Sequence, residues 1–300
     1  MTASPTLYDE SAPRPGSPLT GGAHLDSTAH IMNRISDQLT SQLVSLDGRR
    51  RPGAPALVVV AHGSRDPRAL STVRTLLDRV RALRPGLPVH LGHIELNTPL
   101  LTDTLAGLEA RGTQDAVLVP LLLARGYHVR RDIPEMAANA PVRTRVADPL
   151  GPHPLLVDAL HTRLIEAGWN PSMTSAERRR SAVVLAAAGS RDPDSAVDTR
   201  RTANLLAARL GVPVLPAYAS TAAPTVPTAI RALVARGRDE VAVASCFTAP
   251  GRFATECAQA APWIASAPLG THPAMAALVL HRYDRALAAR AVPELAKVSA

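Results

Sequence analysis

The sequence predicts an α/β protein with two similar lobes, each a short parallel sheet flanked by helices. Short apolar runs alternate with stretches of helical spacing, which is typical of right-handed βαβ crossovers. The chain also repeats itself. Val58–Pro67 returns as Val184–Pro193 with an offset of 126 residues, and Leu108–Gly112 returns as Leu233–Gly237 with an offset of 125. These observations indicate an internal duplication.

The first copy supplies the elements of one lobe. We expect strands at residues 56–61, 88–96, 116–123 and 142–147, and helices at 67–83, 99–111, 132–139 and 153–167. The strands are apolar and rich in β-branched residues, whereas the helices show a helical period of apolar residues. Gly112 and Gly168 stand where helices end, and Pro134 fits a first helical turn.

The second copy repeats this plan. Strands are expected near residues 182–187, 213–219, 241–246 and 263–267, with helices near 195–210, 224–236, 254–260 and 272–289. Two such lobes facing each other leave a cleft, which is a usual place for a ligand.

The predicted domain organisation has four parts. Residues 1–52 form an N-terminal extension, largely disordered with a possible helix over residues 31–46; 53–169 form the first lobe, 170–180 a polar linker, and 181–300 the second lobe. With 300 residues, 46% of them apolar, the chain suffices for two cores of ordinary size.

Composition narrows the functional classes. The net charge is +8, but the arginines are scattered and no aromatic residues accompany them in a stripe, so nucleic acid is not an expected partner. Cys246 and Cys257 are too few for a disulfide framework. No apolar run reaches the roughly 20 residues of a membrane span, and residues 1–22 do not resemble a secretory signal. We therefore expect a cytoplasmic protein.

The most informative side chains follow the first three strands of the first lobe. His62, Glu95 and His128 are spaced by 33 and 33 residues. Because parallel strands end at one edge of a sheet, these side chains are expected to lie together. Imidazoles with a carboxylate suit divalent Fe, Co, Ni or Zn. A lone histidine after a strand usually serves the fold, but here the second copy lacks all three groups, having Ala188, Ser220 and Phe253 instead. Loss as a set favours a metal or acid/base site.

The turn Gly63–Pro67 is kept in both copies, which favours a structural role. Asp66 fits a helix N-cap and Pro67 the first helical position. The same turn could also bind an anion on its N–H groups. Ser64 has no adjacent base that would make it a nucleophile, so we consider it as a substrate contact.

Arg125, Arg130 and Arg131 flank His128 and allow two interpretations. They are either solvated loop charges or a grip for ligand carboxylates. With Tyr127 and the apolar run 121–123 nearby, the loop would suit a large, flat, carboxylate-bearing molecule.

These motifs together resemble the class II sirohydrochlorin chelatases of the CbiX/SirB type. The resemblance rests on His-Gly-Ser-Arg-Asp-Pro after a strand, a Glu at the end of the next strand, and Pro-Leu-Leu-Leu-x-x-Gly-x-His after the third, and covers about residues 55–290. It implies insertion of Fe²⁺ or Co²⁺, with Ni²⁺ as a further candidate, into sirohydrochlorin during sirohaem or cobalamin biosynthesis, with no other cofactor. It also implies that His62 and His128 bind the metal and accept pyrrole protons, joined by Glu95.

Two alternatives stay open at this point. A nonenzymatic metal or tetrapyrrole carrier would need similar ligands. A phosphate-handling α/β enzyme would use His62 and Arg65, but its expected Arg-His-Gly order is missing because Ala61 precedes His62. A duplicated chain builds both walls of the cleft in one polypeptide, so we expect a monomer.

Overall fold

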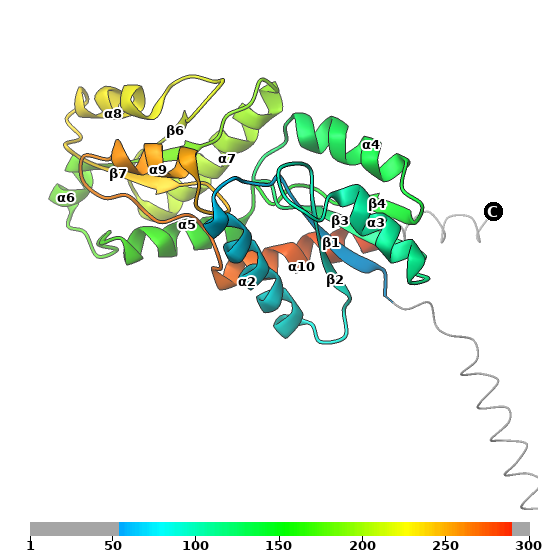
Figure 1. Cartoon of the computed structure of the whole chain (residues 1–300). Helices are drawn as coiled ribbons and strands as arrows, with labels where there is room; N and C mark the ends of the chain where they lie inside the picture. The colour runs from blue at the N-terminus through cyan, green and yellow to red at the C-terminus, as the bar shows by residue number, and fades with distance from the viewer. Residues whose placement is uncertain (1–53, 290–300) are drawn as a thin grey trace, which may run out of the picture. The chain divides into compact units, whose positions relative to one another are not determined.

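The computed structural model describes residues 54–289 and shows, within this range, two sheets that are each built of parallel strands (Figure 1). The N-terminal extension and its possible helix over residues 31–46 lie outside the described residues. The α/β fold class with two lobes is confirmed.

The first sheet is built around its most apolar strand. β1 (Ala56–Ala61) is buried along its whole length, as expected for a central strand covered on both faces. It pairs with β2 (Val89–His93) on one side and with β3 (Asp115–Pro120) on the other, and β4 (Arg143–Val146) pairs with β3. The order is β2-β1-β3-β4, with every pair parallel.

Two helices of the first half begin at side-chain caps, of which the sequence predicted Asp66. Asp66 accepts a hydrogen bond from the Arg68 N–H at the start of α2 (Pro67–Leu83), and His153 accepts one from the Leu155 N–H at the start of α5 (Pro154–Glu166). The others are α3 (Leu101–Ala110), the π-helical turn η1 (His128–Asp132) and α4 (Ile133–Ala138).

The second sheet has three strands in the described part of the chain, in the order β6-β5-β7. They are β5 (Ser181–Ala187), β6 (Val214–Tyr218) and β7 (Glu240–Ser245). The strand expected at residues 263–267 is wrong, since only an isolated bridge joins Ala265 to Val243. Pro262 and Pro268 bracket this segment, and each lacks the N–H group needed to extend a ladder.

The helices of the second half match their expected places. They are α7 (Pro193–Leu210), α8 (Val226–Val234), α9 (Arg252–Gln259) and α10 (Pro273–Ala288). The segment expected as a plain linker contains a further helix, α6 (Ser175–Arg180). A capping box explains it, since Thr174 and Glu177 bond each other's backbone N–H groups.

The two halves exchange their last helices. α10, from the second half, packs on α2 and β3 of the first half, whereas α5, from the first half, packs on α7 and β7 of the second (Figure 1). The Tyr283 hydroxyl donates to the Pro55 carbonyl at 2.6 Å, and Arg84 pairs with Asp284 at 2.6 Å. These bonds tie α10 to the first sheet.

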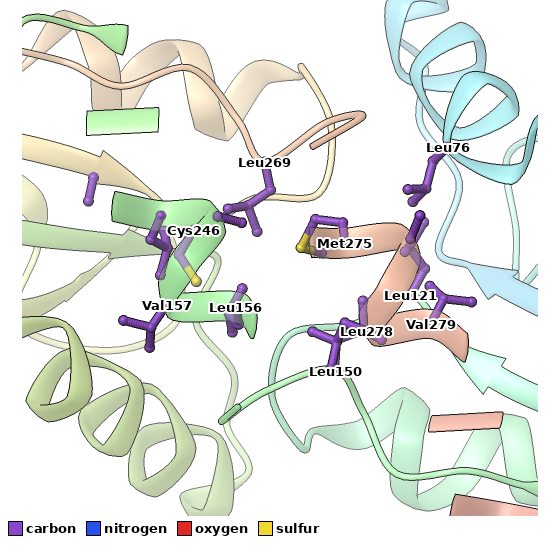
Figure 2. Close-up of a cluster of buried hydrophobic side chains, with 14 of the residues drawn as sticks. Leu76, Leu121, Leu150, Leu156, Val157, Cys246, Leu269, Met275, Leu278 and Val279 are labelled. Atoms are coloured by element: carbon purple, nitrogen blue, oxygen red, sulfur yellow. The ribbon is translucent and has the colours of Figure 1, made fainter. Parts of the chain in front are cut away.

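The exchange produces one core that runs through both halves. Figure 2 shows Met275, Leu278 and Val279 of α10 close to Leu121 and Leu150, with Leu156 and Leu269 in the same cluster. Separate clusters fill the outer faces, under α3 and α4 in the first half and under α8 and α9 in the second. Among residues 54–289, no helix has the length and apolar character needed to cross a bilayer.

Candidate functional site

A cleft of about 1060 Å³ lies between the carboxyl ends of the two sheets. The first half contributes His62 and the segment 121–131, and the second half contributes residues that include Ala188, Ser220 and Phe253. The cleft therefore joins the predicted histidines to the positions that replace them in the second copy.

The two predicted histidines lie side by side in this cleft. The ring centroids of His62 and His128 are 4.7 Å apart, with the ring planes at 88°. Oε1 of Glu95 is 3.5 Å from Nε2 of His62. The His62 and His128 side chains are 41% and 34% exposed, so both can reach a ligand. The structure thus brings the two histidines together in the cleft and places Glu95 beside His62, although Glu95 is not among the cleft-lining residues.

A glycine explains how His62 and Glu95 come close. Gly63 has φ +106°, and a Cβ atom there would lie 1.9 Å from the Glu95 carbonyl oxygen. The Glu95 N–H donates to the His62 carbonyl at 3.0 Å, which fixes the two backbones together. The second copy repeats this contact, because a Cβ on Gly189 would lie 2.0 Å from the backbone carbonyl oxygen of Ser220. The shared turn is therefore structural, as the sequence predicted.

The two glycines provide a matched pair of substitutions. We expect Gly63→Ala and Gly189→Ala each to destabilise the protein by about 1–3 kcal/mol, because the added Cβ meets backbone and a positive φ strains it. Only Gly63→Ala should also weaken Co²⁺ binding, since only that turn positions His62. Urea unfolding and Co²⁺ titration would measure both effects. Equal Co²⁺ affinity in the two variants would contradict this account of the turn.

His128 is held by an acidic residue that the sequence analysis missed. It begins the π-helical turn η1, not the loop that we expected, and the helix then continues as α4. Its Nδ1 lies 2.5 Å from Oδ2 of Asp132, four residues later. With Nδ1–H donating to this carboxylate, Nε2 keeps its lone pair for a metal or a proton. The four-residue spacing was the available signal, but it was not recognised because residues 128–131 were expected outside a helix.

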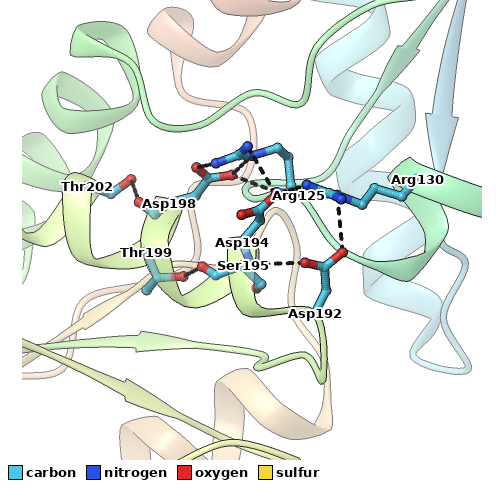
Figure 3. A network of polar contacts seen from close by, with 8 residues as sticks. All are labelled: Arg125, Arg130, Asp192, Asp194, Ser195, Asp198, Thr199 and Thr202. Carbon is cyan, nitrogen blue, oxygen red and sulfur yellow. Dashed lines mark hydrogen bonds and ion pairs between the residues drawn. The ribbon is translucent and has the colours of Figure 1, made fainter.

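Two of the three predicted arginines are engaged by the second half (Figure 3). The Arg125 guanidinium bonds both carboxylate oxygens of Asp198, at 2.7 and 2.8 Å, and reaches Asp194 at 3.2 Å. The Arg125 backbone N–H also donates to Asp198. Arg130 pairs with Asp192 and Asp194. Arg125 therefore serves to join the two halves, whichever ligand the cleft receives.

The other candidates differ in their access to the cleft. Arg131 lines it and forms no salt bridge within residues 54–289, so its charge is available to an acidic ligand. Tyr127 also lines it and is 64% exposed. The Ser64 hydroxyl instead accepts from the Asp66 N–H at 3.1 Å, and Ser64 is not among the cleft-lining residues. Arg65, exposed and likewise absent from the lining, does not assemble the phosphate site with His62.

Two further groups belong to the fold. His93, the last residue of β2, is buried, and its Nδ1 lies 3.1 Å from the Pro99 carbonyl oxygen. Burial raises the pKa of the Cys246 thiol to about 12, so this cleft residue stays protonated and is a poor metal ligand.

The site is open and is not a closed metal cage. In the described range 54–289, no three His, Cys, Asp or Glu side chains already converge in a metal-holding geometry. The pair of imidazoles with Glu95 alongside leaves coordination positions free, which suits an ion that must be released to a second ligand.

The CbiX family model matches residues 56–167 and 182–286. Among curated proteins, the chain is 33% identical over 81 residues to a sirohydrochlorin cobaltochelatase of Methanococcus aeolicus, covering 27% of this chain and 57% of that protein. It is 30% identical over 176 residues to a sirohydrochlorin ferrochelatase of Bacillus subtilis, covering 56% and 64%. Each match therefore spans less than two thirds of the relative's length.

A solved structure shows the same fold over most of the chain. SirB from Bacillus subtilis, determined with Fe³⁺, superposes with a TM-score of 0.64 at 24% identity, covering 77% of this chain and 95% of that one.

Proposed function

Because this chain belongs to the CbiX family, we propose that it inserts a divalent metal, Fe²⁺ or Co²⁺, into sirohydrochlorin. Relatives named as sirohydrochlorin cobaltochelatase and ferrochelatase support both metals. The single observation that carries the proposal is the juxtaposition of His62 and His128, 4.7 Å apart, in a cleft of about 1060 Å³. A cleft of this volume accommodates a ligand of tetrapyrrole size.

The reaction exchanges two protons for one cation. The four pyrrole nitrogens gain M²⁺ and lose two N–H protons, so net charge is conserved. His62 and His128, joined by Glu95, hold the incoming ion. As the ion passes to the pyrrole nitrogens, each imidazole regains its lone pair and accepts one of the two released protons. Asp132 keeps the ring of His128 oriented through its Nδ1. The metal is a substrate here, and the proposal needs no other cofactor.

The carboxylates of the proposed substrate give a function to the arginines that line the cleft. Arg131 is the arginine that we assign to a ring carboxylate, because Arg125 and Arg130 already face the aspartates of α7. Tyr127 is assigned to the edge of the macrocycle. The chain is proposed to act as a monomer in the cytoplasm, with no nucleic-acid or membrane partner.

Anaerobic metal insertion tests the proposal. Sirohydrochlorin is mixed with Fe²⁺, Co²⁺ or Ni²⁺, with and without the protein, and insertion is followed by absorbance. We expect many turnovers per protein above the spontaneous rate. Stoichiometric binding without turnover would instead establish a carrier and refute the enzyme.

A further inference from the structure

Both phenylalanines of the chain lie in the cleft. Aromatic residues make up only 3% of the sequence, and two of them are phenylalanine. Phe247 and Phe253 both line the cleft, and both come from the half opposite the cleft histidines His62 and His128. Apart from Tyr127, no other Phe, Tyr or Trp lines it within the described residues. The chain thus places its scarce phenyl rings on one wall of its ligand site.

Phe253 holds the position that His128 holds in the first half. His128 lies two residues after Gly126, and Phe253 lies two residues after Gly251. In both copies the glycine carbonyl accepts a hydrogen bond from the backbone N–H of the fourth residue after it. The two glycines face the opposite half. A Cβ on Gly126 would lie 3.4 Å from the Ser190 hydroxyl, and one on Gly251 would lie 3.9 Å from the Ser64 hydroxyl. Each loop therefore approaches the Gly-Ser turn of the opposite half, and the two contacts are related as an approximate two-fold pair.

The Phe253 ring is supported from outside the cleft wall. The Arg252 guanidinium lies 4.8 Å from the ring centroid, within range of a cation–π contact. Phe253 itself is only half-buried, whereas its neighbour Ala254 is part of the protein interior. A partly exposed phenyl ring in a cleft has apolar area that a flat ligand can cover.

We propose that Phe253, flanked by Phe247, is the stacking surface that positions the tetrapyrrole against the histidines; this rests on the proposed function. A conjugated macrocycle is planar and gains from stacking on an aromatic ring. The counterparts of His62 and Glu95 are Ala188 and Ser220, and the cleft-lining aspartates of the second half, Asp192 and Asp194, are both paired with Arg130. The ion is then presented from the first half alone, while the second half holds the ring.

The test separates tetrapyrrole binding from metal binding. Fluorescence titration with metal-free sirohydrochlorin would compare wild type with Phe253→Ala, Phe253→Leu and Phe253→Trp, and Thr248→Ala would control for general changes in the cleft. We expect Phe253→Ala to weaken binding about tenfold. Phe253→Leu should recover part of this loss by its apolar area, and Phe253→Trp should recover most of it. Co²⁺ titration should give wild-type affinity in every variant.

Three outcomes decide between the ideas. If Phe253→Ala binds sirohydrochlorin as wild type does, the stacking role is refuted while the chelatase stands. If Phe253→Leu equals wild type, an aromatic surface is not required and the proposal is also refuted. If wild type itself does not bind sirohydrochlorin, the proposed function fails together with this inference. In steady-state insertion, a positioning role predicts a raised KM for the tetrapyrrole and an unchanged KM for Co²⁺.

Discussion

Replacing either cleft histidine, His62 or His128, with alanine is expected to reduce metal insertion at least about 100-fold, the lower end of the range for loss of a proton-transfer group, because a metal ligand is lost with it. The two imidazoles lie 4.7 Å apart, so one cannot substitute for the other without moving the ion. Both side chains are partly exposed, and neither belongs to the hydrophobic core clusters, so the fold should survive. Initial rates with Co²⁺ and sirohydrochlorin, corrected for the spontaneous reaction, measure the loss.

The chain offers matched controls for this experiment. His161→Ala removes a histidine from α5, away from the cleft lining, and should leave the insertion rate unchanged. His128→Phe copies the residue of the second half and should be as inactive as His128→Ala. Asp132→Asn keeps the size of the side chain but removes its charge, so its rate should lie between those of wild type and His128→Ala. Insertion at the wild-type rate by both alanine variants would refute the proposed site.

Removing Asp198, the buried partner of the cleft residue Arg125, is expected to cause a large loss of stability. Its side chain is 2% exposed, and it accepts from the Arg125 guanidinium and from the Arg125 backbone N–H. Asp198→Ala leaves these donors without their acceptor, so we expect a loss of about 2–4 kcal/mol in the free energy of unfolding. Urea denaturation of the full chain measures this loss.

The pH dependence of stability should reveal the same interaction between Asp198 and Arg125. Burial raises the pKa of the Asp198 carboxyl, but the hydrogen bonds and charge of Arg125 outweigh burial and lower it overall. A carboxyl with a lowered pKa in the folded state stabilises the protein above its ordinary pKa, and that stabilisation is lost as pH falls through the folded value. The difference between wild type and Asp198→Ala should therefore stay constant from neutral pH to about pH 5 and shrink below about pH 4. A difference that grows on acidification would exclude the ion pair as its cause.

Double substitution identifies the partner. If the charge of Asp198 matters through Arg125, Asp198→Ala should cost much less in an Arg125→Met background than in wild type. If Asp198→Ala lowers the free energy of unfolding equally in both backgrounds, packing around Asp198 explains its contribution and the ion pair with Arg125 does not.

The duplication made much of the fold predictable from sequence. Alignment of Gly63–Pro67 with its copy fixed the first strand and helix of each half, and the Asp66 cap confirmed the start of α2. The exchange of α5 and α10 was not predictable, because the apolar face of a helix does not identify which sheet it will cover. Similarly, nothing in the pattern excluded a strand at residues 263–267 except the prolines at its ends.

The site was predictable to the extent that it depends on strand ends. His62, Glu95 and His128 follow three parallel strands, so topology alone brings them to one edge. The partners of Arg125 could not be deduced, since Asp194 and Asp198 lie about 70 residues away on a helix whose surface charges look ordinary in sequence. Charge complementarity between distant segments has no signature in one sequence, whereas the spacing of His128 and Asp132 had one.

The exchanged helices make the two halves dependent on each other. A gene divided at the link before α6 would produce a first fragment without α10, whose bare inner sheet would expose Leu121 and Val119, and a second fragment without α5. Each fragment would lack the helix that covers its sheet, and mixing the two fragments would restore both helices to their places. The half that lacks His62 and His128 is therefore indispensable even before any ligand arrives, because it donates the helix that covers the sheet of the other half.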